Sequence, residues 1–148
     1  MQNSFEITSD FTKYKQAFLA QNAKHNLISK NDENFLYEKH IYDSLAIKLF
    51  FDKYNILSGN ILDIGCGGGF PCLPIAIECS SFNILGVDSI RKKIDSVQTI
   101  ANKLNLKNIE ILSLFILEER FSIIFSENTV STVSHNILLI YINGRASI

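Results

Sequence analysis

The sequence predicts an α/β fold in which helices alternate with the strands of a parallel sheet. Short apolar segments typical of buried strands recur after residue 59, and segments with the apolar spacing of helices separate them. A glycine-rich turn at Gly65–Gly69 directly follows the first of these apolar segments, as at the ligand-binding edge of such sheets. The 148 residues are 47% hydrophobic and 20% charged, which indicates one globular domain.

Helices are expected before the first strand. Apolar residues recur at helical spacing over 9–26, and Asp10 can cap the start of this helix. A second helix is expected over about 31–51, where apolar positions share one side and Lys39 and Lys48 are left for solvent.

The first strand is expected at Ile61–Ile64 and leads into the glycine turn Gly65–Gly69. A helix then runs to about Cys79. Pro71 and Pro74 fit its first turn, because the backbone nitrogens there have no intrahelical acceptor to lose.

Three further strands are expected, at Phe82–Val87, Asn108–Leu114 and Phe121–Phe125. A helix over 90–104 separates the first two of them. Because crossover connections in parallel sheets are right-handed, the glycine turn is expected at the carboxyl edge of the sheet, where ligands bind.

The charge balance and the positions of Cys and His give no sign of a strongly basic nucleic-acid-binding protein, of a disulfide framework or of a metal site. Fourteen Lys and Arg against fifteen Asp and Glu give a net charge of -1, so any contact with nucleic acid must come from a local patch. Cys66, Cys72 and Cys79 form no CxxC pair and are expected to be reduced packing residues. The three histidines are scattered without metal-ligand spacing, so no metal site is expected.

A cytoplasmic location is expected. The first ten residues lack the positive charge and apolar block of a secretory signal. The longest apolar run, Ile137–Ile142, is far shorter than the roughly 20 residues of a membrane-spanning helix.

The glycine turn and a following acid indicate a nucleotide-like cofactor. Glycines permit positive φ and a close approach of the backbone to a ligand, and the next helix presents its positive end. Asp88 ends the second strand, about 20 residues beyond the glycines, where it can accept hydrogen bonds from ribose hydroxyls. The dinucleotide fingerprint fails, because Phe70 and Cys72 stand where it needs a small residue.

The pattern Asp63-x-Gly65-x-Gly67-x-Gly69 looks like the first motif of S-adenosylmethionine-dependent methyltransferases. Its surroundings resemble the glucose-inhibited division protein B family, whose members methylate N7 of a guanine in 16S ribosomal RNA. The segments that carry the resemblance are Asp63–Ile77, Asp88–Ile94, Leu106–Ile109, Asn26–Ser29 and His40–Ser44. The run GFPCLP after the glycines is more discriminating than the glycines themselves, and the likeness covers about residues 10–112.

The resemblance implies a class I, Rossmann-like methyltransferase that uses S-adenosylmethionine and acts on 16S rRNA or the small ribosomal subunit, as a monomer. The residues that it assigns to the cofactor site are Asp63, Gly65, Gly67, Gly69, Phe70, Asp88, Leu117 and Glu118. Of these, the glycines shape a loop that Phe70 lines, Asp88 holds the ribose and Asp63 acts at the methionine end. No catalytic base is assigned, because guanine N7 carries a lone pair and no proton, so transfer requires positioning above all.

Two other features allow more than one interpretation. Arg91-Lys92-Lys93 begins a helix beside the ligand-binding edge and could contact phosphate or be a solvated helix face. His40 is either a packed side chain or a substrate contact.

The chain departs from the family pattern after Leu112. The family's Arg before the pair Glu118-Glu119 is absent, and Glu127 stands where the family has the Arg of Ser-Arg-Ala. Only 23 residues follow Phe125, too few for the last strands of a seven-stranded sheet. Residues 129–144 contain no Asp, Glu, Lys or Arg, so the run ILLIYI is expected to be aggregation-prone beside an unpaired sheet edge.

The predicted organisation is one methyltransferase-like domain, 1–148, truncated or divergent at its C-terminal end. It comprises N-terminal helices at 1–58, a cofactor-binding core at 59–125 and a divergent tail at 126–148. Three functional hypotheses follow: methyl transfer to rRNA, a cofactor-binding remnant without activity, and, as a minor alternative, a nicotinamide-dependent oxidoreductase.

Overall fold

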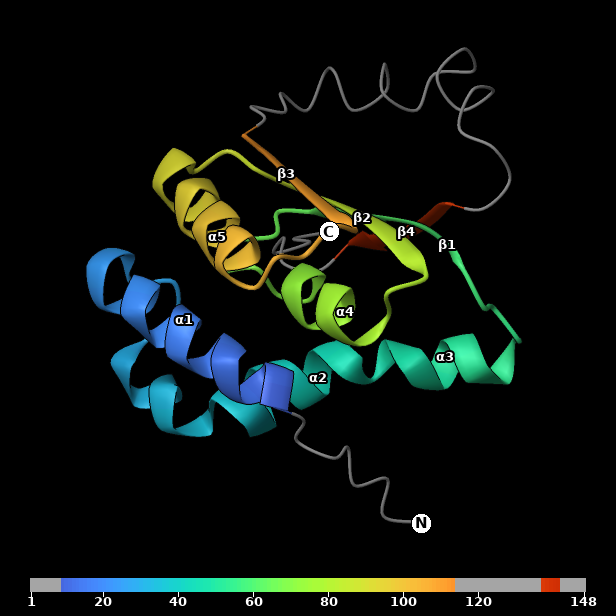
Figure 1. Cartoon of the computed structure of the whole chain (residues 1–148), viewed down its shortest axis with the longest axis horizontal. Helices are drawn as coiled ribbons and strands as arrows, with labels where there is room; N and C mark the ends of the chain where they lie inside the picture. Colours follow the sequence, from blue (N-terminus) through green and yellow to red (C-terminus); the bar gives the residue numbers. More distant parts are fainter. Residues whose placement is uncertain (1–8, 114–136, 142–148) are drawn as a thin grey trace, which may run out of the picture.

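A computed structural model of the chain describes residues 9–113 and 137–141 (Figure 1). Its centre is a parallel sheet of four strands in the order β3-β2-β1-β4. The strands are β1 (Gly59–Ile64), β2 (Phe82–Asp88), β3 (Ile109–Ser113) and β4 (Ile137–Tyr141). The predicted α/β fold with a parallel sheet is therefore confirmed.

The register of the strands brings the predicted ligand-binding residues to one edge. Ile64 at the end of β1 pairs with Val87, and Asp88 at the end of β2 pairs with Ser113. Parallel strands end on the same side of a sheet. The glycine loop after β1 and the acid that ends β2 consequently lie next to each other at the carboxyl edge.

The strand β4 was not predicted from the sequence, and it forms one edge of the described sheet. Its residues fall in the apolar run that was expected to lie beside an unpaired sheet edge, and they pair with β1 from Asn60–Ile137 to Ile64–Tyr141. An uncharged run without proline is suited to a sheet, because pairing satisfies its backbone groups. The strand expected at Phe121–Phe125 lies outside the described residues.

The helix α1 (Ser9–His25) matches the expected helix at 9–26. It ends where Asn26 takes a positive φ of 48°, a conformation that asparagine adopts at helix ends. Phe11, Tyr14 and Phe18 are buried on one side of this helix. Figure 1 shows α1 outside α5, which in turn packs on the sheet.

The second expected helix, over 31–51, is wrong as a single element. The structure divides this region into a 3-10 helix η1 (Lys30–Phe35), a π-helical turn η2 (Tyr37–Ile41) and the α-helices α2 (Tyr42–Leu45) and α3 (Ile47–Lys53). Leu36 and Ile41 are both buried, although five positions along an α-helix turn a side chain by about 140° from its starting face. A π turn brings such positions to one side.

The remaining helices match their predictions. Helix α4 (Cys72–Glu78) begins after Pro71 and holds Pro74 in its first turn. Helix α5 (Arg91–Lys103) follows β2, and both helices lie on one side of the sheet (Figure 1). No helix within 9–113 is long and apolar enough to cross a membrane.

The core lies between the sheet and these helices. Ile61 of β1 and Ile84 of β2 are buried members of this core. At the other end of the sheet from the glycine loop, the rings of Phe51 and Phe82 stack with centroids 4.5 Å apart. This stack attaches α3 to the start of β2 and so connects the N-terminal helices to the sheet.

Candidate functional site

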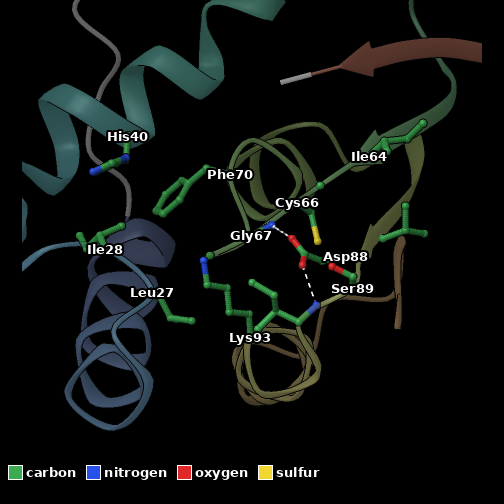
Figure 2. A pocket seen from close by; sticks show the side chains of 14 residues that line it. Leu27, Ile28, His40, Ile64, Cys66, Gly67, Phe70, Asp88, Ser89 and Lys93 are labelled. Carbon is green, nitrogen blue, oxygen red and sulfur yellow. Dashed lines mark hydrogen bonds between the residues drawn. The ribbon is translucent and has the colours of Figure 1, made fainter. Parts of the chain in front are cut away.

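A pocket of about 570 Å³ lies at the carboxyl edge of the sheet (Figure 2). Its walls come from the segment after α1, from η2, from the glycine loop, from the end of β2 and from the start of α5. The lining residues are Leu27, Ile28, His40, Ile64, Gly65, Cys66, Gly67, Gly68, Phe70, Val87, Asp88, Ser89, Ile90 and Lys93.

The glycine loop is held against the end of β2. The backbone nitrogens of Gly65 and Cys66 both donate to the carbonyl oxygen of Val87, at 2.8 and 3.0 Å. Gly67 has a φ of +52° and lines the pocket with backbone alone. The loop thus presents a surface that a ligand can approach closely.

Gly69 contributes to helix packing, whereas Gly67 lines the pocket. It does not line the pocket, and a Cβ at this position would lie 2.5 Å from Cδ1 of Leu73 and 3.3 Å from Cγ1 of Val97. Both neighbours are fully buried, so neither can move away easily. Gly69 therefore allows helix α4 to pack closely under the loop.

The carboxylate of Asp88 is bound on both oxygens. Oδ2 accepts a hydrogen bond from the backbone nitrogen of Gly67 at 2.8 Å, and Oδ1 accepts one from that of Ile90 at 2.8 Å. Figure 2 shows both bonds beside the pocket. Each carboxylate oxygen has a further lone pair, so Asp88 can fix the loop and still accept hydrogen bonds from a ligand.

Asp63 lies beneath the loop and not on the pocket surface. Its side chain is 0% exposed, and Oδ2 accepts a hydrogen bond from the backbone nitrogen of Cys72 at 3.2 Å. Its other oxygen has no hydrogen-bond partner among the described residues. Burial raises the pKa of Asp63 to about 7, and the nearby charge of Asp88 adds to this.

Phe70 and His40 form an aromatic wall of the pocket. Their ring centroids are 4.8 Å apart at 31°, and Phe70 also contacts the ring of Phe18 at 5.2 Å. Phe70 therefore lines the pocket and belongs to the core at once. Burial lowers the pKa of His40, which favours the neutral ring at pH 7. Its Nε2 is buried with no partner in the described part of the chain.

Only one residue of the cationic run at the start of α5 reaches the pocket. Arg91 is exposed and pairs through Nε with Asp95 at 3.0 Å, and Lys92 is exposed. Lys93 is partly buried and lines the pocket. The sequence alone could not say which of the three faces the site.

Sequence reasoning missed Leu27 and Ile28 as pocket residues. Both belong to the segment 26–29 that carries part of the family resemblance, which was the available signal. Leu117 and Glu118, assigned to the site from the sequence, lie outside the described residues. The three cysteines are free and buried, as predicted. Within 9–113 and 137–141, no cluster of His, Cys, Asp or Glu could hold a metal ion.

Comparison with known proteins identifies the family. The sequence profile of the family described as rRNA small subunit methyltransferase G matches residues 7–131. The chain belongs to this family. The resemblance to the glucose-inhibited division protein B family is thereby confirmed, and membership decides against the nicotinamide-dependent oxidoreductase. Membership and the strand order β3-β2-β1-β4 confirm the Rossmann-like methyltransferase fold.

Curated members of the methyltransferase G family are similar over much of this chain. The protein of Leuconostoc citreum is 33% identical over 102 residues, which cover 69% of this chain and 43% of that protein. The protein of Mycoplasma capricolum is 33% identical over 126 residues, which cover 82% and 53%. The chain therefore spans about half the length of these curated relatives. Among solved structures, an O-methyltransferase from Bacillus cereus in complex with SAH is 17% identical, with a TM-score of 0.49, over 94% of this chain and 57% of that one.

Proposed function

We propose that this protein binds S-adenosylmethionine in the pocket and transfers its methyl group to N7 of a guanine in 16S rRNA. The hydrogen bond between Asp88 and Gly67 carries the proposal, because it joins the two predicted halves of a cofactor site at 2.8 Å. Membership of the methyltransferase G family supports the reaction and the class of substrate.

The residues present fit this cofactor. Gly67 lines the pocket and leaves open the space that a Cβ would take: beyond its chain neighbours, the only described atom within 4 Å of that position is the carbonyl oxygen of Gly65, at 3.7 Å. Asp88 would hold the ribose hydroxyls through its free lone pairs, and Ile90 offers an apolar surface for the adenine. Gly65 and Phe70 would line the methionine part, and Asp63 would support the loop from below. When bound, S-adenosylmethionine supplies an electrophilic methyl group on a positively charged sulfur.

The chain's own residues need only hold and orient the reactants. Guanine N7 attacks through a lone pair, so no proton has to be removed and no general base is required. His40 and Phe70 offer an aromatic surface at the pocket. Exclusion of water by the apolar residues Leu27 and Ile28 would favour productive alignment.

The RNA would be held by local charge. Arg91 and Lys92 are exposed next to the pocket residue Lys93 and are suited to phosphate contacts. Methyl transfer to a nitrogen lone pair needs no Lewis acid, so no metal ion is required. We place the reaction in the cytoplasm, on ribosomal RNA or small subunits, with the protein acting as a monomer.

A remnant that binds the cofactor without transferring methyl is the second candidate. The observation that favours it is the absence of the family's Arg before Glu118 together with the acid at Glu127. A carboxylate that faces RNA phosphate would weaken RNA binding.

Two measurements on the full chain test the proposal. Calorimetry with S-adenosylmethionine should show binding at one site. Small ribosomal subunits whose target guanine is unmethylated should then gain label from methyl-labelled cofactor, and subunits already methylated there should not. Binding without transfer would favour the remnant, and absence of binding would refute the proposed cofactor site.

A further inference from the structure

Lys93 is the one Lys or Arg among the described residues that line the pocket. It stands in the first turn of α5, and its two cationic neighbours do not line the pocket: Arg91 is engaged with Asp95 and Lys92 is exposed. In Figure 2 the Lys93 side chain extends from α5 past Gly67, and its amine nitrogen lies toward Leu27 and Phe70.

The ammonium group of Lys93 has no ion pair or hydrogen bond within the described residues. Among the described lining residues the one carboxylate is that of Asp88, and it is already bound by the amides of Gly67 and Ile90. Leu27, Ile28 and Phe70 give this part of the pocket apolar walls. A ligand with an anionic group would give the ammonium of Lys93 the ionic partner that the described residues do not supply.

We propose that Lys93 binds the α-carboxylate of the amino-acid part of S-adenosylmethionine. The inference rests on the proposed function, since it presupposes that the cofactor occupies this pocket. The α-carboxylate is the only anionic group of the cofactor, and a carboxylate prefers a charge-assisted hydrogen bond in a partly enclosed site. The ribose is uncharged, and its hydroxyl groups can donate hydrogen bonds to Asp88. Asp88 would therefore bind the ribose, and Lys93 would bind the carboxylate.

His40 does not compete with Lys93 for this role. It lines the same pocket, but burial lowers its pKa and so favours the uncharged ring at pH 7. The positive charge opposite the ligand's carboxylate therefore comes from Lys93 alone among the described lining residues.

A pair of ligands isolates the amino-acid part. S-adenosylhomocysteine and 5′-methylthioadenosine share the adenosine and an uncharged sulfur, but only the first carries the amino-acid group. The substitution Lys93→Met removes the charge and keeps an unbranched apolar stem. It should weaken binding of S-adenosylhomocysteine in calorimetry by about tenfold, because a charge-assisted hydrogen bond at a partly exposed site is lost. Binding of 5′-methylthioadenosine should stay within about twofold of the unsubstituted chain, which also shows that the variant is folded.

Two further variants complete the test. Lys92→Met removes the same charge one position away and should change neither affinity, and Lys93→Arg should keep the preference for S-adenosylhomocysteine. If Lys93→Met leaves the ratio of the two affinities unchanged, the inference is wrong. A raised KM for small ribosomal subunits in that variant would then assign Lys93 to RNA phosphate. If the unsubstituted chain binds neither ligand, the proposed cofactor site fails and the inference fails with it.

Discussion

Oδ2 of Asp88 lies 2.8 Å from the backbone nitrogen of Gly67, so the acid at the end of β2 holds the loop that follows β1. The two residues are 21 positions apart in the sequence. The hydrogen bond makes Asp88 part of the loop's structure as well as a residue for ligand binding. A loop amide bound by a carboxylate is fixed before the ligand arrives, which reduces the entropy lost on binding.

Substitution of Asp88 should therefore weaken the binding of the cofactor. We expect Asp88→Ala to reduce the affinity for S-adenosylmethionine by about 1 to 3 kcal/mol, because hydrogen bonds to a charged acceptor are lost and the loop is released. Asp95→Ala removes an exposed acid on α5 that pairs with Arg91 and should leave the affinity unchanged. Calorimetry measures both, and an unaltered affinity in Asp88→Ala would remove this residue from the site.

Two glycines of the loop should respond to alanine by different amounts and for different reasons. At Gly69 the new methyl would meet Leu73 at 2.5 Å with φ at +92°, so Gly69→Ala should lower the free energy of unfolding by about 2 kcal/mol or more. At Gly67 the new methyl would meet the carbonyl oxygen of Gly65 at 3.7 Å, which is no clash. Gly67→Ala should therefore cost about 1 kcal/mol of stability, and this cost comes from the positive φ. Because Gly67 lines the pocket, its variant should lose affinity for S-adenosylmethionine.

Urea denaturation and calorimetry on the two variants separate these effects. Equal stability of Gly69→Ala and Gly67→Ala would contradict the close packing of α4 under the loop.

Asp63 should make stability depend on pH. Burial raises its pKa from 3.8 to about 7 in the folded chain, so the folded state holds a proton that the unfolded state releases above pH 4. The free energy of unfolding should therefore fall as pH rises from about 4 to 7 and level off above that. Asp63→Asn removes this dependence and keeps an oxygen that can accept from the backbone nitrogen of Cys72.

The stability of Asp63→Asn relative to the unsubstituted chain should thus rise by about 2 to 4 kcal/mol between pH 4 and pH 7. Denaturation with urea at several pH values gives the two curves. Parallel curves would show that Asp63 ionises as an ordinary carboxyl group.

Asn108, within the segment 106–109 that carries part of the family resemblance, is a structural residue. Its side-chain Nδ2 donates to the carbonyl oxygens of Ala76, Cys79 and Phe82, at 3.1, 3.3 and 3.1 Å. We expect Asn108→Ala to lower the free energy of unfolding by about 1 to 3 kcal/mol, because these partly buried carbonyls lose their shared donor.

A matched control for Asn108 is Asn83→Ala. The side chain of Asn83 is exposed and bonds to Asn60 at 3.3 Å, so its loss should cost about 0.5 kcal/mol or less. Equal losses in thermal or chemical denaturation of the two variants would show that Asn108 does not bind the turn between α4 and β2.

Local signals were sufficient for the strands β1, β2 and β3 and for the glycine loop. The strands β1 and β2 and the helices α1, α4 and α5 follow from apolar periodicity and from Gly and Pro positions. The succession η1, η2, α2 could not be predicted, because the π turn at Tyr37–Ile41 depends on which side chains of that segment meet the core. The same holds for His40, Leu27 and Ile28, which tertiary packing brings to a pocket built around a loop far along the chain.

The place of β4 could not be decided from the sequence, because two apolar segments suit it. Phe121–Phe125 fits the family pattern, and Ile137–Tyr141 is a run without charge. The strand beside β1 is selected by pairing, in which Leu62 lies opposite Leu139, and no local propensity reports on that pairing.

Proline substitutions can decide which segment pairs with β1. Ile140 lies opposite Asp63 in the ladder, and proline there removes a backbone donor and disfavours a place within a paired strand. We expect Ile140→Pro to lower the free energy of unfolding by about 2 to 3 kcal/mol and to raise the hydrogen-exchange rates of β1 amides.

The matched variant is Ile123→Pro, in the segment that the family pattern assigns to this place. Because β1 carries Asp63 and leads directly into the glycine loop, Ile140→Pro should also weaken the binding of S-adenosylmethionine. Ile123→Pro should weaken this binding less. The reverse order, with Ile123→Pro the more damaging in denaturation and in calorimetry, would return the strand to 121–125 and overturn the pairing of 137–141 with β1.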